Sequence, residues 1–467
     1  MSETQRLDGF RSEFENLTLT IIDLIGKQNG LVNTIALDKS RYEMFLTNTA
    51  VERHLQDIVL ERCNIAGVST VLGLRLLNQI IGESIRIQKM TFDSAPSIDG
   101  NRLFAKAKDM EDSGQKLIHL EIGEPDFGPP EAVVRATAEA LAHNLTRYTQ
   151  PVGIPTLKQK IAHRLNETYH TEVTPQEVII TVSGRYALYL ATTCTLQAGD
   201  EAIIIDPSFP AYSSFIGLAG ARVVRIPTEF NDDWRLDIDR VQESINKSTK
   251  VIIVNSPCNP SGKILDEQTC NALVDLAVEN NITILSDEVY SPYSYTPFTS
   301  FLQLPEHSRI ILDSFSKAYG MTGFRLGYAV ADPTMIEKMA HIQALHLTSA
   351  PEFIQYAGLA ALDCQTEVQQ NVAVIRSRLE LVSSLLENLP LSFKPADGGF
   401  YIFAKLEDRE SDAGKFSESL LHEKGVCVMP GLVYGPHYKS FFRIAVCQSE
   451  DRLREGITRM EELLRKL

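Results

Sequence analysis

The chain has 467 residues, of which 44% are hydrophobic and 22% charged, an ordinary balance for a globular protein long enough for two or three domains. Its formal net charge of -15 argues against nucleic-acid binding as the main function, because such proteins present a basic surface. The charged N-terminus is unlike a signal peptide, and no apolar run approaches the ~18 residues of a membrane span, so we expect no membrane contact and a cytoplasmic location. The seven cysteines stand singly, without CxxC pairs or histidine clusters at metal spacing, which predicts reduced thiols and no metal site.

Residues 1–92 show helical periodicity and no strand pattern. The first helical pattern consists of apolar residues three or four positions apart: Phe10, Phe14, Leu17, Ile21 and Leu24. Two further helical patterns cover residues 51–59 and 72–90. The simplest interpretation of these apolar faces is a helical module that dimerises and has no catalytic activity.

Polar residues interrupt or border the apolar faces of these helices: Arg11, Lys39, Glu52, Ser84 and Gln88. In this spacing, and in the ending at residues 80–88, the segment resembles the all-helical chorismate mutases, which form an intertwined dimer and hold chorismate between long helices. The resemblance implies that Arg11 contacts a substrate carboxylate. Lys39 and Gln88 would donate to the ether oxygen. Glu52 and Ser84 would hold the ring hydroxyl and a carboxylate region.

The rearrangement of chorismate to prephenate is intramolecular, so such a site only has to hold the reactive conformer and stabilise charge on the ether oxygen. Three positions depart from the family. Gln28 and Val51 stand where it has carboxylate-binding arginines, and Asn48 stands where it often has aspartate. An active mutase and a degenerate domain that binds an effector or dimerises therefore both remain open.

Residues 91–100 are small and polar with one proline, Pro96, which predicts a domain boundary. We expect a helical domain over 1–92, a linker and N-terminal arm over 93–116, and a larger unit over 117–467. Within that unit we expect a large domain over about 140–345 and a small domain from the remaining N- and C-terminal parts.

From Leu117 onward, short apolar runs alternate with helical patterns. The runs lie at residues 178–182, 201–205, 250–254, 282–285 and 310–312. Continuous apolar strands separated by helices predict an α/β fold with a mostly parallel sheet covered on both faces. Sites in such sheets lie at the carboxyl ends of the strands.

Polar segments follow each of these runs. They are Ser183–Leu188, Pro207–Tyr212, Asn255–Gly262, Ser286–Tyr290 and Ser314–Arg325. The first is a glycine turn that opens a helix and offers amides to an anion. In the last, Lys317 stands among hydroxyl residues and an arginine, which suits a Schiff-base lysine beside a phosphate, as pyridoxal phosphate requires. Taken singly, each of these polar segments could have a purely structural role. For Asp287 that role would be a helix N-cap.

Together, and in this order, these segments make residues 117–467 resemble the class I, fold type I, pyridoxal-phosphate-dependent aminotransferases of the aspartate, prephenate and aromatic branch. The expected fold is thus an all-α chorismate mutase-like domain followed by the α/β transferase fold with a large and a small domain. The catalytic residues implied are Lys317, Asp287 and Tyr290. Lys317 would carry the cofactor and move the substrate proton, and Asp287 would keep the pyridine nitrogen protonated.

The resemblance also implies the other contacts of pyridoxal 5'-phosphate. Asn259 and Tyr290 would donate to its phenolic oxygen, and Phe209 would stack on its ring. The phosphate would be held by Gly184, Arg185, Tyr186, Ser314, Ser316 and Arg325. Tyr148 would reach the phosphate bound by the neighbouring subunit, so a homodimer is expected.

The substrate contacts implied by the resemblance are those of Gly123, Arg185, Phe209, Asn259 and Arg443. Arg443 would hold the substrate carboxylate bidentately, the alternative being a surface ion pair. Arg185 stands where this branch commonly has a lysine for the distal carboxylate, which favours a dicarboxylic or prephenate-like substrate. Tyr186 departs from a frequent glutamine.

The expected function is a bifunctional chorismate mutase and aminotransferase. It would transfer an amino group between glutamate or aspartate and prephenate, an aromatic 2-oxo acid or oxaloacetate. The substrates are therefore small amino acids and oxo acids, with no nucleic-acid partner. Two alternatives remain: a lyase on the same fold, and an aminotransferase with a regulatory or dimerising helical domain.

Overall fold

The structure is a computed structural model that describes residues 16–17, 19–21, 23–32, 35, 49–94, 100–305, 308–407 and 412–466. The chain divides into two compact units, Met1–Ser97 and Ile98–Leu467. Each unit is described by itself. No helix among the described residues is both long and apolar enough to cross a membrane.

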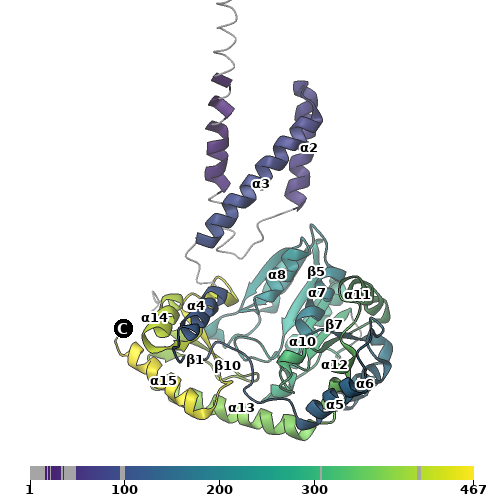
Figure 1. Ribbon diagram of the computed structural model, residues 1–467, viewed down its shortest axis with the longest axis vertical. Coiled ribbons are helices and arrows are strands. Elements are labelled where there is room, and N and C mark those ends of the chain that lie inside the picture. The colour runs from purple at the N-terminus through teal and green to yellow at the C-terminus, as the bar shows by residue number, and fades with distance from the viewer. Residues whose placement is uncertain are drawn as a thin grey trace, which may run out of the picture. The chain divides into compact units, whose positions relative to one another are not determined.

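The first unit is helical wherever it is described, apart from the turn before residue 70. Helices α2 (Thr49–Ala66) and α3 (Thr70–Ser94) pack side by side (Figure 1). Gly73 permits their close approach, since a Cβ atom there would lie 2.2 Å from the Cys63 Sγ. α3 continues beyond the end predicted at residue 90, into the segment expected to be linker.

The apolar seam predicted for the first helix is described only in part. Leu17, Ile21 and Leu24 lie on helical backbone and are exposed, whereas Phe10 and Phe14 lie outside the described residues. Exposed apolar side chains continue on α2 and α3: Leu55, Ile58, Ile65, Val71, Leu72 and Leu76.

The second unit begins with α4 (Gly100–Asp112), within the segment predicted as linker and arm. Leu103 and Ala107 of α4 are buried against Leu421 and Cys427, and Lys106 pairs with Glu418. This helix therefore packs against the C-terminal part of the unit.

A seven-stranded sheet forms the centre of the large domain, in the order β2-β8-β7-β6-β5-β3-β4 (Figure 1). Its strands are β2 (Val178–Thr181), β3 (Glu201–Asp206), β4 (Arg222–Pro227), β5 (Thr249–Asn255), β6 (Thr283–Asp287), β7 (Arg309–Ser314) and β8 (Gly327–Ala331). All neighbours pair in parallel except β8, which runs antiparallel to β2 and β7. The prediction of a mostly parallel sheet is confirmed.

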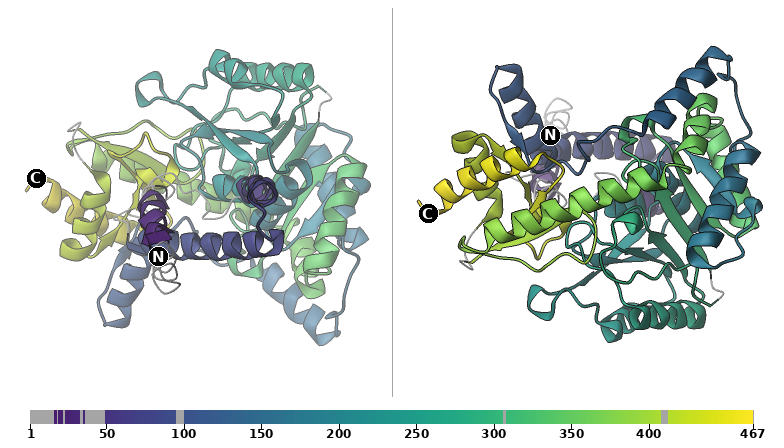
Figure 2. Two further views of the ribbon diagram at one scale, coloured as in Figure 1. Left: turned by 90° about the horizontal axis from the view of Figure 1, so that it is seen from above. Right: turned by 90° about the horizontal axis from the view of Figure 1, so that it is seen from below.

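Helices cover both faces of this sheet (Figure 2), which explains why the central residues of its strands are apolar on both sides. Ile203 and Ile252 face one core and the next residues, Ile204 and Ile253, face the other, as the two-residue period of a strand requires. The first core includes residues of α5 (Glu131–Ala142), α6 (Pro155–Tyr169), α9 (Ile238–Ser244), α10 (Glu267–Asn280) and α12 (Glu352–Ala361). The second includes residues of α7 (Gly184–Thr195), α8 (Ala211–Leu218) and α11 (Pro333–His346).

The small domain follows α13 (Gln365–Leu386), the long helix that leads out of the large domain (Figure 2). Its antiparallel sheet has the order β12-β13-β10-β9, formed by β9 (Leu391–Ser392), β10 (Tyr401–Leu406), β12 (Met429–Pro430) and β13 (Phe441–Ala445). A separate parallel pair joins β1 (Ile118–His119) to β11 (Val426–Cys427). The remaining helices are α14 (Ala413–Lys424) and α15 (Glu450–Leu464).

Short 3₁₀ turns complete the second unit: η1 (Pro175–Glu177), η2 (Phe230–Asp232), η3 (Ser291–Tyr293), η4 (Thr322–Phe324) and η5 (Gly431–Tyr434). Two of them stand next to polar segments singled out in the sequence. η3 follows β6, and η4 precedes Arg325.

Candidate active site

Parallel pairing brings the ends of β5 and β6 together. Asn255 and Asp287, the last residues of these strands, are register partners. The Asn255 amide donates to the Asp287 carbonyl oxygen at 2.9 Å and accepts from the Asn259 backbone amide at 2.8 Å. The asparagine thus links the end of β6 to the turn that follows β5.

The Asp287 carboxylate is held by a hydroxyl that the sequence did not single out. Tyr212, at the start of α8, donates its hydroxyl to Asp287 Oδ2 at 2.7 Å. Burial raises the pKa of the Asp287 carboxyl, and the Tyr212 hydroxyl opposes that rise. The N-cap alternative is not supported, because the next helical turn is η3 and its N-cap residue is Tyr290.

Lys317 lies in the loop after β7 and reaches across to the N-terminal segment of the unit. Its Nζ donates to the Gly123 carbonyl oxygen at 2.5 Å. Burial, together with the nearby cations Arg443 and Arg185, lowers the pKa of Lys317 to about 8, against the opposing effects of Cys447 and Glu124. A substantial fraction of this amine is therefore neutral, and so nucleophilic, near pH 8.

Arg443 lies on β13 and is 6% exposed, so the alternative of a surface ion pair is wrong. Its Nη1 donates to Asn259 Oδ1 at 2.8 Å, and its Nη2 donates to the Glu121 carbonyl oxygen. The guanidinium carbon lies 4.2 Å from the centre of the Tyr401 ring, while Nε is buried without a hydrogen-bond partner. Its described hydrogen bonds thus go to neutral oxygens, which leaves the positive charge available to an anion.

Two tyrosine hydroxyls meet beside this arginine. Tyr290 and Tyr401 lie 3.0 Å apart at their oxygens, and the Asn259 amide donates to Tyr290 at 3.5 Å. Gly123 packs against the same group, since a Cβ atom there would lie 1.9 Å from the Tyr401 hydroxyl oxygen. Only glycine lets the backbone come this close to the tyrosine.

A second group of donors gathers where α7 begins. A Cβ atom on Gly184 would lie 3.2 Å from the Ser314 Cβ, so the helix start packs directly against the end of β7. The Ser314 hydroxyl accepts from the Ser316 amide at 3.2 Å. The Tyr186 amide, expected to face an anion, already donates to the Ser183 hydroxyl, which caps the helix.

Two arginines stand at this group. Burial lowers the pKa of Arg325, and the charge of Arg185 is the next cause, as expected of two neighbouring cations. The Arg185 guanidinium carbon lies 5.5 Å from the centre of the Phe209 ring, within range of a cation–π contact. The helix N-terminus, the two serines and the Arg325 guanidinium form a set of donors suited to a phosphate, while the Arg185 guanidinium lies over Phe209.

Some of the predicted site residues do not lie near Lys317 or near the donors at the start of α7. Tyr148 is 85% exposed on the surface of the unit. Arg11 and Lys39 lie outside the described residues, as do the side chains of Glu52 and Gln88. Ser84 is partly buried on α3.

Sequence reasoning also missed members of the site. Tyr212 stands in the same segment after β3 as Phe209, and that position was its only signal. Tyr401 and the Glu121 carbonyl had no local signal, because contacts with residues far along the chain define them.

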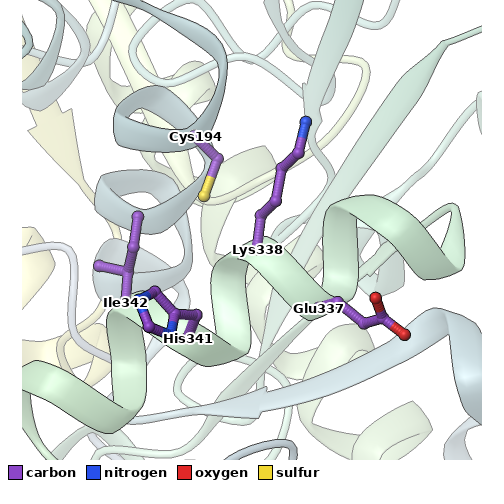
Figure 3. A pocket seen from close by; sticks show the side chains of 5 residues that line it. All are labelled: Cys194, Glu337, Lys338, His341 and Ile342. Carbon is purple, nitrogen blue, oxygen red and sulfur yellow. The ribbon is translucent and has the colours of Figure 1, made fainter.

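Two hollows can be compared with the position of this group. One, of about 430 Å³, lies between α7 and α11 and is lined by Cys194, Glu337, Lys338, His341 and Ile342 (Figure 3). A cavity of about 30 Å³ adjoins Tyr212 and Asn255. The candidate site is therefore assigned from the reactive residues around Lys317 and not from the volume of a hollow.

Known proteins with similar sequences and folds agree with this geometry. The sequence profile described as "Aminotransferase class I and II" matches residues 115–460. An aspartate aminotransferase of Pyrococcus abyssi is 33% identical over 78% of this chain and 95% of its own length. An aspartate/prephenate aminotransferase of Thermus thermophilus is 33% identical over 82% of this chain and 99% of its own.

A solved structure extends the likeness to the fold. The crystal structure of an aspartate aminotransferase from Thermotoga maritima superimposes with a TM-score of 0.75, at 33% identity, over 78% of this chain and 96% of that one. The helical first unit precedes the matched residues. On the profile, the identities and the superposition, the chain belongs to the class I and II aminotransferases and is a pyridoxal-phosphate-dependent enzyme.

Proposed function

We propose that the second unit transfers an amino group between glutamate or aspartate and oxaloacetate, prephenate or an aromatic 2-oxo acid. One observation carries the proposal: the buried Arg443 has no carboxylate partner among the described residues, and it lies close enough to the amine of Lys317 to help lower its pKa. An amino acid offers a carboxylate to the first and its reacting carbon to the second. The names of the Pyrococcus and Thermus relatives support these substrates.

The residues present fit pyridoxal phosphate. Its phosphate matches the donors at the start of α7, where Gly184 and Ser314 pack without room for a side chain between them. Its aldehyde matches the amine of Lys317, and its pyridine nitrogen matches the Asp287 carboxylate. When bound, the cofactor supplies an electron sink for the charge left when the substrate Cα–H bond breaks.

We assign the proton movements to two residues. Asp287, which accepts a hydrogen bond from Tyr212, would keep the pyridine nitrogen of the cofactor protonated. Lys317 Nζ would take the proton from the substrate Cα and hold it for return, a general-base role near neutral pH that its lowered pKa suits. Tyr290 and Asn259 donate to the phenolic oxygen.

Arg443 holds the substrate α-carboxylate with its planar fork. Asn259 and the Glu121 carbonyl orient that fork through its two terminal nitrogens. Gly123 lets the backbone approach the same carboxylate. Phe209 stacks on the cofactor ring.

The distal carboxylate is assigned to Arg185. Its guanidinium is exposed next to Phe209 and close enough to Lys317 to lower that pKa. We also propose a homodimer in which Tyr148 reaches the neighbouring subunit's phosphate, which fits its 85% exposure in the single chain.

The test supplies pyridoxal phosphate and measures oxo-acid formation from aspartate, glutamate, phenylalanine and alanine, and arogenate formation from prephenate, by mass spectrometry. Arg185→Ala should lower kcat/KM for aspartate about 30- to 100-fold, because it removes a charge-assisted pair, and change it less than about threefold for alanine. Arg135→Ala, an exposed arginine on α5, is the matched control.

Equal losses for aspartate and alanine would contradict the assignment of Arg185. A lyase on the same fold gives a different product pattern. It would release ammonia and an oxo acid without using an acceptor oxo acid, whereas transamination consumes the acceptor in equal amount.

We further propose that the first unit rearranges chorismate to prephenate. The paired helices α2 and α3, with Ser84 partly buried on α3, support this second function. Chorismate turnover should be measurable without pyridoxal phosphate, should fall in Ser84→Ala and should persist in Asn78→Ala, an exposed position on α3. Chorismate that alters transamination without being consumed would indicate a regulatory domain instead.

A further inference from the structure

A cluster of potential metal ligands lies in the small domain, apart from the catalytic residues. β1 and β11 pair in parallel, with His119 directly opposite Cys427. Register partners project to the same side of a sheet, and Glu121 follows His119 by two residues along the chain. One ligand atom from each of these three residues lies within 4.8 Å of the others, the single group of this kind in the described part of the chain.

The cluster contains a buried polar atom without a partner. Glu121 is 2% exposed, and its Oε1 lies 2.7 Å from His119 Nδ1. Its Oε2 is buried and makes no hydrogen bond with any described residue. An unsatisfied buried carboxylate oxygen is costly, and a cation between these side chains would satisfy it.

The charge balance around the cluster also favours a cation. Glu111, near the end of α4, brings a second carboxylate to 3.1 Å from His119 Nε2. Arg443 and Arg452 contact the same segment, but they donate to the backbone carbonyls of Glu121 and Leu117, not to the Glu121 carboxylate. Two carboxylates and a thiol therefore face a single imidazole.

The donor set has a clear metal preference. Imidazole nitrogen, thiolate sulfur and carboxylate oxygen are the ligands of zinc, whereas calcium and magnesium take oxygen alone. Cys427 would bind zinc as the thiolate, after losing the proton of its thiol. Zinc ligation would release that proton to solvent.

We propose that His119 Nδ1, the Glu121 carboxylate and the Cys427 thiolate bind one Zn²⁺ ion, with water as the fourth ligand. Glu111 would accept from His119 Nε2–H and fix the ring, the usual arrangement for a metal-bound histidine. The ion would anchor the segment whose carbonyls contact the site, at Glu121 to Arg443 and at Gly123 to Lys317. Its role is structural, and the reaction does not pass through it.

The interpretation that competes with a zinc site is that His119 forms ion pairs and the neighbouring Cys427 is only a buried core residue. His119 contacts both carboxylates, and Cys427 packs in an apolar cluster with Leu103 and Leu117. This arrangement needs no metal. It leaves Glu121 Oε2 unexplained, and it predicts that none of these residues affects zinc binding.

The test uses the full-length, tag-free holoenzyme after treatment with a chelator, dialysed against Zn²⁺ and measured by elemental mass spectrometry. We expect one equivalent of zinc per chain. Cys427→Ala and Glu121→Gln should each weaken binding at least about 100-fold, and Glu111→Gln about 10- to 100-fold. Cys270→Ala is the matched control, a buried cysteine in the large-domain core that should bind as the unchanged protein does.

Co²⁺ in place of Zn²⁺ gives a second readout. We expect the red-region bands of tetrahedral cobalt with a thiolate ligand, lost in Cys427→Ala and kept in Cys270→Ala. If Cys427→Ala does not fold, Glu121→Gln carries the test, because its side chain has nearly the same shape. Less than stoichiometric zinc, or binding unchanged in the folded cluster variants, would overturn the proposal. Neither result depends on the substrates assigned above.

Discussion

Single residues here take their chemistry from what surrounds them. Lys317 is an ordinary lysine in sequence, and burial beside Arg443 and Arg185 brings its pKa to about 8. Asp287 is subject to two opposed effects, since burial raises its pKa and the Tyr212 hydroxyl lowers it. Both effects can be tested by pH.

The lowered pKa of Lys317 predicts the pH range in which its amine reacts with an aldehyde. Below pH 8 the neutral fraction falls about tenfold per pH unit, so capture of pyridoxal phosphate by cofactor-free protein should speed up to about pH 8 and then level off. Borohydride trapping and mass spectrometry measure the rate. Lys317→Ala should trap nothing at this position, and Lys338→Ala, exposed on α11, should behave normally. A rate that still rises tenfold between pH 9 and about pH 10 would contradict the shift.

Tyr212→Phe removes the hydroxyl that donates to Asp287. Because that bond lowers the pKa of Asp287, its loss should raise the pKa further and move the acidic limb of the kcat profile to higher pH. We expect kcat near pH 7 to fall about tenfold, the value of one hydrogen bond to a charged group. Tyr189→Phe on α7 is the control, and an unshifted limb would show that Tyr212 does not tune the carboxyl group.

At the scale of elements, segments distant in sequence meet at close contacts. The segment after β1 passes between β13 and the loop of Lys317, and it is fixed by the carbonyls of Glu121 and Gly123. Tyr401, the first residue of β10, fills the space beside Gly123. The small domain thus shapes the site through a tyrosine and an arginine on neighbouring strands.

Gly123→Ala tests this contact. The added Cβ would lie 1.9 Å from the Tyr401 hydroxyl, so either the tyrosine or the segment must shift. We expect a loss of about 1–3 kcal/mol in the free energy of unfolding and at least a tenfold loss of kcat/KM. Gly128→Ala, where no atom lies within 4 Å of the new Cβ, is the matched control. Urea unfolding and initial rates measure both effects, and equal behaviour of the two variants would refute the packing argument.

The whole chain divides into two compact units, Met1–Ser97 and Ile98–Leu467. The family match begins at residue 115, yet α4, at Gly100–Asp112, packs into the second unit through Leu103 and Ala107. The functional boundary of the aminotransferase unit should therefore precede α4.

Truncation tests the boundary. A variant lacking residues 1–97 should fold and keep kcat for aspartate within about threefold, because α4 and its buried contacts remain. A variant lacking residues 1–116 exposes Leu421 and Cys427 and removes the Lys106–Glu418 pair, so we expect a lower melting temperature. Thermal unfolding and activity measure the two variants. Inactivity of the first variant would mean that the first unit is required by the second.

Much of the fold could be predicted from sequence because the local pattern is unambiguous. Strands buried on both faces have apolar central residues. The apolar runs in the sequence therefore predicted β2, β3, β5, β6 and β7 without any knowledge of tertiary contacts. The polar segments after them were placed correctly at one edge, because parallel strands end on the same side. Asp287, Asn259 and Lys317 followed from that rule. The mutase activity proposed for the first unit, with Arg11 and Lys39 in its site, stays a prediction.

The sequence by itself determined the sheet, the order of its polar ends and the lysine among them, since each depends on neighbours along the chain. Only the tertiary structure decided which distant groups meet. Tyr212 bonds a carboxylate 75 residues away, Tyr290 meets Tyr401 across 111 residues, and Arg443 reaches Glu121 across 322. His119 and Cys427 come together in the same way, by strand register. Such contacts arise when the chain closes on itself, and burial there sets the pKa values, so no local spacing could reveal them.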